Sequence, residues 1–182
     1  TSVAFKTVPY YLTNSTSVDC EIINEGVTAY RCGPDGLPMG QTFGKGETIF
    51  KGPLMMAAAG TIPSYGYELK MFPFAAKRRG MMNLRFGALP TTSILANLPG
   101  LWKGTWFPDG MFDVHCSDVR LKFSRPMAFQ VAGDAEGLAR VVELAHADLL
   151  GTQEVLVLEP PQVEREEHAL AEFDCHVGDL GL

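Results

Sequence analysis

The sequence predicts a mainly β protein: a two-layer antiparallel β-sandwich with one or two short helices. Its 19 glycines and 12 prolines are spread along the 182 residues, which is typical of many short strands joined by tight turns. Hydrophobic residues make up 46% of the chain and charged residues 20%, an ordinary balance for a globular protein and too apolar for a disordered one. The stretch 118–123 alternates between polar and apolar residues, which indicates a strand with one buried face.

Short β-favouring runs fill the first half of the chain. The tripeptide Asn24-Glu25-Gly26 separates two of them and predicts a hairpin turn between paired strands. Residues 32–46 have the glycine- and proline-rich composition of turns. The strands expected in this half are 3–12, 18–23, 27–31, 48–59 (a single buried strand) and 67–71.

One helix is expected in the first 130 residues. Thr91-Thr92-Ser93 offers hydroxyl groups for an N-cap, and Ile94, Leu95 and Leu98 follow at helical spacing until Pro99 ends the run.

The second half of the chain returns to strands. The alternation of 118–123 continues over 127–131, 139–145 fits either a strand or a helix, and 154–158 is strand-like. The charged segment 162–173 has helical propensity. We therefore divide the chain into a β-rich domain, residues 1–158, and a helical or extended tail, residues 159–182.

Charge and hydropathy exclude some classes of protein. The net charge of −6 argues against a nucleic-acid-binding protein, which usually has a basic excess or stripe. No apolar run reaches 18 residues, so no membrane-spanning helix is expected. The chain starts at Thr1 without Met or a signal-peptide pattern, and we interpret this start as the boundary of a fragment.

The four cysteines form no CxxC pair. We expect unpaired thiols in a reducing cytoplasm, with disulfides as the alternative. The pairs His115-Cys116 and Cys175-His176 suggest a zinc site on paper, but adjacent residues on a strand point to opposite faces, so we reject it. The cysteines are Cys20, Cys32, Cys116 and Cys175.

Three segments resemble a known family in their order and spacing. They are 65–75 (YGYELKMFPFA) with 79–85 (RGMMNLR), then 93–104 (SILANLPGLWKG), then 126–137 (PMAFQVAGDAEG). Together they are similar to the C-terminal domain of the diacylglycerol kinase catalytic family, which includes bacterial lipid kinases and the sphingosine and ceramide kinases. Each motif alone is weak, and their order makes the case.

The resemblance implies a transferase of phospholipid metabolism that moves the γ-phosphate of ATP to a lipid hydroxyl such as that of diacylglycerol. It places Asp134 where a carboxylate takes up or orients the proton of that hydroxyl, assisted by the glycine turn at Gly133. The alternative for Ala132-Gly133-Asp134 is an ordinary turn at the end of a strand.

Two positions depart from the family pattern. Arg79 stands where the family has an aspartate that helps to hold a structural magnesium ion, so we expect no metal there. Ala132 replaces the first acidic residue of the family's Asp-Gly-Glu. Asp109-Gly110 also fits an Asp-Gly pattern, but it lies too close to Ala132 in the sequence, and we interpret Asp109 as a turn residue.

The resemblance also implies a separate nucleotide-binding domain. The family's Gly-Gly-Asp-Gly-Thr loop does not occur in this sequence, and Gly44-Lys45-Gly46 lacks the spacing of a phosphate loop. We therefore expect ATP and Mg²⁺ to be bound by an N-terminal domain outside this chain, and the isolated chain to be inactive.

Lipid contacts are assigned to aromatic and basic residues. Trp102 and Trp106 are candidates for a lipid-facing lip, since Trp favours membrane interfaces, with a core cluster as the alternative. Arg79, after Lys77-Arg78, is a candidate contact for phosphates or headgroups, with a solvent-facing basic loop as the alternative.

Two other functions stay open at the level of sequence: a non-catalytic lipid-binding relative of the kinases, and a β-sandwich interaction domain unrelated to lipids. We expect a cytoplasmic protein, at most peripheral to a membrane, whose partners are its lipid and its own nucleotide-binding domain. Association into a homodimer is also left open.

Overall fold

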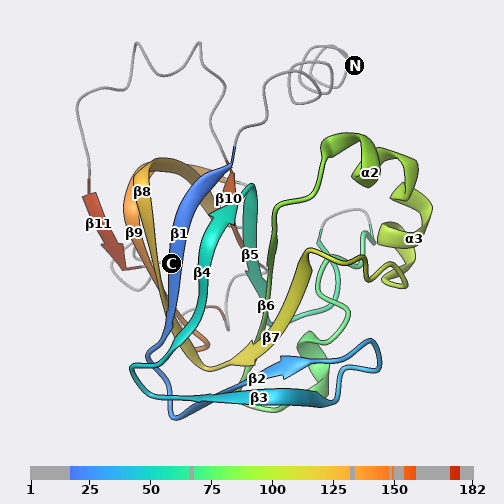
Figure 1. Ribbon diagram of the computed structural model, residues 1–182, viewed down its shortest axis with the longest axis horizontal. Helices are drawn as coiled ribbons and strands as arrows, with labels where there is room; N and C mark the ends of the chain where they lie inside the picture. Colours follow the sequence, from blue (N-terminus) through green and yellow to red (C-terminus); the bar gives the residue numbers. More distant parts are fainter. Residues whose placement is uncertain are drawn as a thin grey trace.

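The computed structural model describes residues 17–65, 68–131, 134–147, 149, 154–158 and 173–176. The fold is mainly β, an antiparallel sandwich with two short α-helices, which confirms the predicted fold class (Figure 1). The helices are α2 (Thr91–Ala96) and α3 (Leu98–Lys103), and a 3₁₀ turn, η1, covers Ala75–Lys77. The strands are β1 (Val18–Asn24), β2 (Thr28–Cys32), β3 (Pro38–Gly44), β4 (Thr48–Leu54), β5 (Met56–Gly60), β6 (Met82–Gly87), β7 (Met111–Cys116), β8 (Asp118–Val131), β9 (Asp134–Ala145), β10 (Glu154–Leu158) and β11 (Phe173–His176).

The long strand β8 connects the two layers of the sandwich. Its first half pairs with β1, which pairs with β4, and its second half pairs with β10. From β10 the second layer continues through β5, β6, β7 and β2 to β3. Strand β9 follows β8 along its length, and β11 adds a parallel edge to β9. The hydrogen-bonded network is therefore continuous, and it folds over on itself where β8 and β9 arch across (Figure 1).

The main core lies between the two layers. Strand β1 alternates strictly, with Val18, Cys20 and Ile22 buried, and β6 contributes Met82 and Leu84 from the facing layer. Burying each large aliphatic side chain contributes about 1.5–3 kcal/mol, so this alternation is the main stabilising feature of the sandwich. The remaining members of the core are Ala29, Phe43, Leu54, Ala57, Ala59, Phe86, Val114, Cys116, Val119, Leu121, Phe123, Met127, Phe129, Val131, Ala139, Val142, Leu144 and Leu149.

The outer face of the second layer is also covered. Every residue of β6 is buried, including those that point away from the main core. The described parts of the segments 61–81 and 88–110 contribute to this cover: Phe72 packs with Ala58 and Ala75 in a second, smaller core, and Phe107 stacks on Phe74. Gly60 permits this packing, since a Cβ at that position would lie 2.4 Å from the Phe72 ring.

Two predicted connections in the first half of the chain are wrong. Asn24-Glu25-Gly26 does not form a hairpin, because β1 pairs with β4 and β8 whereas β2 pairs with β3 and β7. This turn therefore carries the chain from one layer to the other. The buried amide group of Asn24 holds the turn in place by donating to the carbonyl oxygen of Phe43 at 2.9 Å. The range 48–59 is two strands, because the chain changes layer at Met55.

Four further expectations need revision. Residues 32–46 contain β3 between two turns, and Leu69 makes only an isolated bridge with Tyr65 where a strand was predicted. Pro99 lies in the first turn of α3 and so begins a second helix, consistent with its fixed φ. Pro90 occupies the N-cap of α2, which has no side-chain cap hydrogen bond.

Other expectations agree with the structure or cannot be compared with it. The ambiguous range 139–145 belongs to β9, and Cys20, Cys32 and Cys116 are free thiols. The predicted strand 3–12 and residues 162–172 of the helix-prone segment 162–173 lie outside the described residues, and its last residue, Phe173, begins strand β11. Among the described residues, no helix is long and apolar enough to cross a bilayer.

Candidate functional site

A row of polar side chains lies on the covered outer face of β6 and β7. Asn83 and Arg85 alternate with core residues along β6, and Asp113 and His115 do the same along β7. The antiparallel register sets Asn83 opposite His115, and Arg85 opposite Asp113. All four side chains are buried, so each needs polar partners to offset the loss of water.

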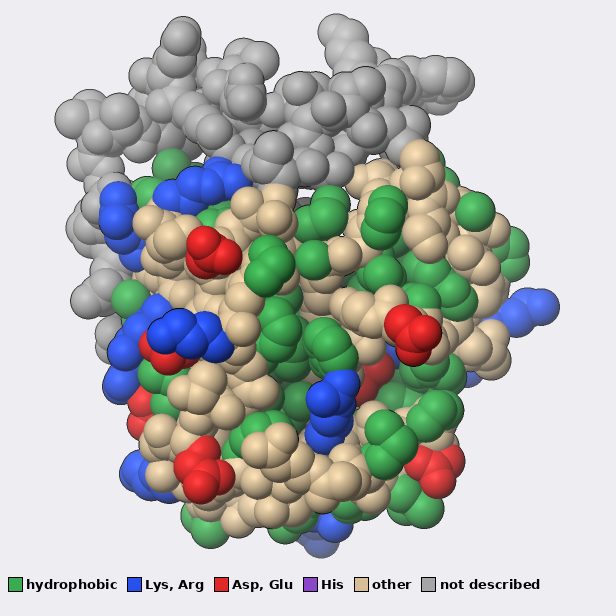
Figure 2. Space-filling model, viewed as in Figure 1, with side chains coloured by type: hydrophobic (Ala, Val, Ile, Leu, Met, Phe, Trp, Pro, Cys, Tyr) green, Lys and Arg blue, Asp and Glu red, His purple; other side chains and the backbone are tan. Residues whose placement is uncertain are grey.

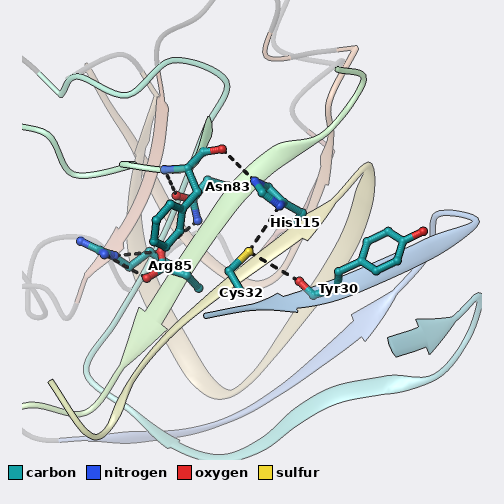
Figure 3. Close-up of polar contacts among 7 residues, drawn as sticks. Tyr30, Cys32, Asn83, Arg85 and His115 are labelled. Carbon is teal, nitrogen blue, oxygen red and sulfur yellow. Dashed lines mark hydrogen bonds and ion pairs between the residues drawn. The ribbon is translucent and has the colours of Figure 1, made fainter. Parts of the chain in front are cut away.

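Asn83 and His115 together hold the backbone of Phe74. The amide N–H of Phe74 donates to Oδ1 of Asn83 at 3.2 Å, and Nε2 of His115 lies 2.7 Å from the carbonyl oxygen of Phe74 (Figure 3). Pro73-Phe74-Ala75 belongs to the first segment that resembles the kinase family. The cross-strand pair therefore positions that segment on the sheet, and we call this arrangement the Phe74 clamp.

Arg85 and Asp113 form a two-pronged ion pair beside the clamp. Nε and Nη2 of Arg85 donate to Oδ1 and Oδ2 of Asp113 at 3.0 and 2.9 Å. The side-chain Nδ2 of Asn83 donates a hydrogen bond to Oδ1 of the same carboxylate at 2.9 Å. The ring of Phe107 lies 5.6 Å from the guanidinium carbon and stacks on Phe74. The ion pair thus links the clamp to the second covering segment.

The tautomer of His115 follows from its two contacts. A carbonyl oxygen can only accept, so Nε2 carries the proton that it donates to Phe74. Burial lowers the pKa of His115, which favours the neutral ring and leaves Nδ1 as an acceptor. Sγ of Cys32 lies 3.3 Å from Nδ1 and donates its S–H there.

This thiol–imidazole contact is structural. Burial raises the pKa of Cys32 to about 11, so the protonated thiol predominates near neutral pH, whereas a nucleophilic cysteine needs a lowered pKa. His115 is also fully buried, so a substrate has no access to it. Within the described part of the chain, no three His, Cys, Asp or Glu side chains are grouped to hold a metal ion. Cys32, Asn83, Arg85, Asp113 and His115 therefore form a network that fixes a covering segment.

Asp134 is the first residue of β9, directly across the β8–β9 connection from Val131. The structure describes its backbone and not its side chain, and Gly133 lies outside the described residues. One residue before Val131, Gln130 donates its side-chain amide to the hydroxyl of Tyr65. The tip of this long hairpin therefore lies beside the start of the first resembling segment.

The two tryptophans predicted to contact lipid differ in exposure. Trp102 is exposed on α3, and its carbonyl oxygen accepts a hydrogen bond from the backbone N–H of Lys70 at 3.2 Å. Trp106 is half-buried and packs against Gly100. Phe107 and Phe112 are also half-buried: Phe107 stacks on Phe74, and the ring of Phe112 lies tilted against that of Phe86.

Arg79 is exposed in the turn between η1 and β6. Its neighbour Arg78 is half-buried, with its guanidinium 4.1 Å above the ring of Tyr30, and Lys77 donates to the carbonyl of Asp35. Within the described residues, no hydrogen bond or ion pair joins Arg79 to Trp102 or Trp106. The structure therefore favours a solvent-facing position for Arg79.

No family model and no curated protein matches this chain. The geometry described above is therefore the basis for any functional proposal.

Sequence reasoning missed the buried network. The signal was present as the polar residues at alternate positions of 82–86 and of 112–116, each flanked by apolar neighbours. Such alternation normally indicates a solvated face, so it did not distinguish buried polar residues from exposed ones. His115 and Cys116 do point to opposite faces, toward Phe74 and into the main core respectively.

Proposed function

We propose that this chain is the lipid-binding part of a lipid kinase of the diacylglycerol kinase type. The reaction transfers the γ-phosphate of ATP to a lipid hydroxyl such as that of diacylglycerol. ATP and Mg²⁺ belong to a separate nucleotide-binding domain in this proposal, and Arg79, a cation, does not suit a metal site.

The observation that supports the proposal is contact among the three segments that resemble the family. Gln130, from the third segment, donates to Tyr65 at the start of the first. Lys70, in the first segment, donates to Trp102 in the second. The first segment thus contacts the third beside the hairpin that carries Asp134, and it contacts the second through Lys70, as residues of one binding region would.

The proposed role of Asp134 is that of a general base. Its carboxylate accepts the proton of the lipid hydroxyl as that oxygen bonds to the γ-phosphorus and the bond to the bridging oxygen of ADP breaks. Asp134 is the first residue of β9, after a short connection from β8, and in this proposal the second domain approaches the lipid there.

A non-catalytic lipid-binding relative of the kinases is the second candidate. Ala132 and Arg79 stand where the family has acidic residues, and both replacements remove charge that phosphoryl transfer or metal binding uses. Such a protein would bind lipid in the same region but would not transfer phosphate.

The test is phosphoryl transfer by the full-length protein from radiolabelled ATP to a panel of lipid alcohols, including a soluble short-chain diacylglycerol. Asp134→Asn should lower transfer by about a hundredfold or more, the usual contribution of a general base. The matched control is Asp109→Asn, which changes an exposed aspartate in the turn before β7 and should leave the rate unchanged.

The three outcomes separate the candidates. Transfer that falls only in Asp134→Asn supports the kinase and the role of Asp134. Transfer that is equal in both variants refutes that role. Absence of transfer to every lipid, with lipid binding retained, favours the non-catalytic relative.

A further inference from the structure

The helices α2 and α3 expose three large apolar side chains. Leu95, Leu98 and Trp102 are 38%, 40% and 44% exposed. Leu98 and Trp102 are four residues apart on α3 and so share a face, whereas Leu101 points inward and is buried. Figure 2 shows hydrophobic side chains gathered over the region where Figure 1 places these helices. We call Leu95, Leu98 and Trp102 the α2–α3 tip.

The tip belongs to a stretch of chain in which every charged residue is basic. Residues 69–108 contain six of the 15 Lys and Arg residues and none of the 21 Asp and Glu residues, which leaves nine basic against 21 acidic residues elsewhere. Arg85 is neutralised by Asp113 inside the sheet. Lys70 and Lys103 are exposed, and both adjoin Trp102: Lys103 follows it in sequence, and the backbone of Lys70 is hydrogen-bonded to it.

This combination of side chains fits one partner better than others. Trp and Leu beside Lys are the usual composition of a surface that rests in the headgroup region of a bilayer. A second copy of the chain would bring like charges together, and three apolar side chains are few for a stable protein interface.

We propose that the α2–α3 tip docks on an anionic phospholipid bilayer. Leu95, Leu98 and Trp102 enter the boundary between headgroups and acyl chains, and Lys70 and Lys103 contact the lipid phosphates. The purpose of the docking, delivery of a bilayer lipid to the region of Asp134, rests on the proposed function. The docking itself follows from an apolar tip with basic neighbours and is independent of the proposed function.

The test is co-sedimentation of the full-length protein with vesicles of phosphatidylcholine alone and of phosphatidylcholine mixed with phosphatidylglycerol. We expect binding to the mixed vesicles that weakens with added salt. Leu98→Ser with Trp102→Ser should weaken it by about tenfold or more, because two buried apolar anchors are lost. The control pair is Val27→Ser with Leu37→Ser, which changes two residues that are 85% and 62% exposed elsewhere on the surface.

A second pair of variants tests the charge. Lys70→Glu with Lys103→Glu should weaken binding by about tenfold or more, since two charges that attract the anionic surface become charges that repel it. Lys45→Glu with Lys122→Glu reverses the charge of two other exposed lysines and should weaken vesicle binding much less. Trp102→Phe should keep binding but abolish the blue shift of tryptophan emission that vesicles cause.

Three results would overturn the proposal: no binding to the mixed vesicles, equal binding to neutral vesicles, or equal losses in tip and control variants. The kinase proposal is tested separately with the soluble short-chain diacylglycerol, which requires no bilayer. Vesicle binding through the tip without phosphorylation of any lipid would therefore refute the kinase and leave the docking surface.

Discussion

His115 and Asn83 lie directly opposite each other on β7 and β6, and together they bind both backbone polar groups of Phe74. Two strands thus use their side chains to hold a segment that forms no strand of its own. This clamp fixes Pro73-Phe74-Ala75 over the outer face of the sheet, close to Lys70 and the helix that carries Trp102. Several predictions about stability depend on it.

Removing one side of the clamp should destabilise the protein. Asn83→Ala leaves the buried N–H of Phe74 without its acceptor, at a cost of about 1–3 kcal/mol in the free energy of unfolding. Urea denaturation measures this cost. Asn97→Ala is the matched control, because Asn97 is half-buried and its side chain donates to Ser93 within a helical turn. Equal losses of unfolding free energy in the two variants would mean that the clamp stabilises the protein no more than an ordinary side-chain hydrogen bond.

The buried ion pair should be costly to break from one side. Arg85→Met leaves the carboxylate of Asp113 buried without its cation, which should lower the free energy of unfolding by about 3–5 kcal/mol. The double change Arg85→Met with Asp113→Leu should cost clearly less than the sum of the single changes. The exposed pair of Lys51 and Glu21 provides a control, since Lys51→Met should cost about 1 kcal/mol or less. Additive costs at Arg85 and Asp113 would contradict the coupling.

Stability should fall when His115 is protonated. Burial lowers the pKa of His115 in the folded protein, and the nearby cations Lys77 and Arg78 lower it further. The unfolded chain therefore takes up the proton at a higher pH, near 6.5, than the folded protein does. The contribution of the neutral His115 ring to the free energy of unfolding is complete above that pH. Below it, the free energy of unfolding should decrease by up to about 1.4 kcal/mol per pH unit until the folded pKa is reached.

The measurement is urea denaturation of the wild type and of His115→Gln over a series of pH values. The stability difference between them should shrink as the pH falls below about 6.5. His146→Gln is the control, because His146 lies in a turn and is only half-buried. A difference that stays constant with pH would show that the His115 ring does not change its charge on unfolding.

Cys32 should react slowly with alkylating agents in the folded protein. Burial raises its pKa to about 11, and its S–H is donated to His115. At pH 8 only about one thiol in a thousand is then ionised. Mass spectrometry of peptides after iodoacetamide treatment measures the rate, and the same reaction in guanidinium chloride provides the reference. Equally fast labelling in both conditions would indicate a thiolate paired with an imidazolium, contrary to the structure.

Local patterns in the sequence predicted several strands well because the main core depends on strict alternation. The alternation over 118–123 and 127–131 identified β8, whose buried residues all belong to the core between the layers. Predictions failed where the chain changes layer. Asn24-Glu25-Gly26 has the composition of a hairpin turn, and 48–59 is mostly apolar, but each contains a crossing from one layer to the other. A crossing leaves no periodic signal, because it depends on which distant strand each part pairs with.

Alternation, turn residues and apolar runs, which are local properties of the chain, were enough to predict the class of fold and the position of most strands. Only the tertiary structure decided that Asn83, Arg85, Asp113 and His115 are buried together, since the register of β6 and β7 and the covering segment at Phe74 bring them into contact. Tertiary contacts also bring Tyr65 to Gln130 and Lys70 to Trp102, because hydrogen bonds between distant segments form only after the sheet has folded over on itself.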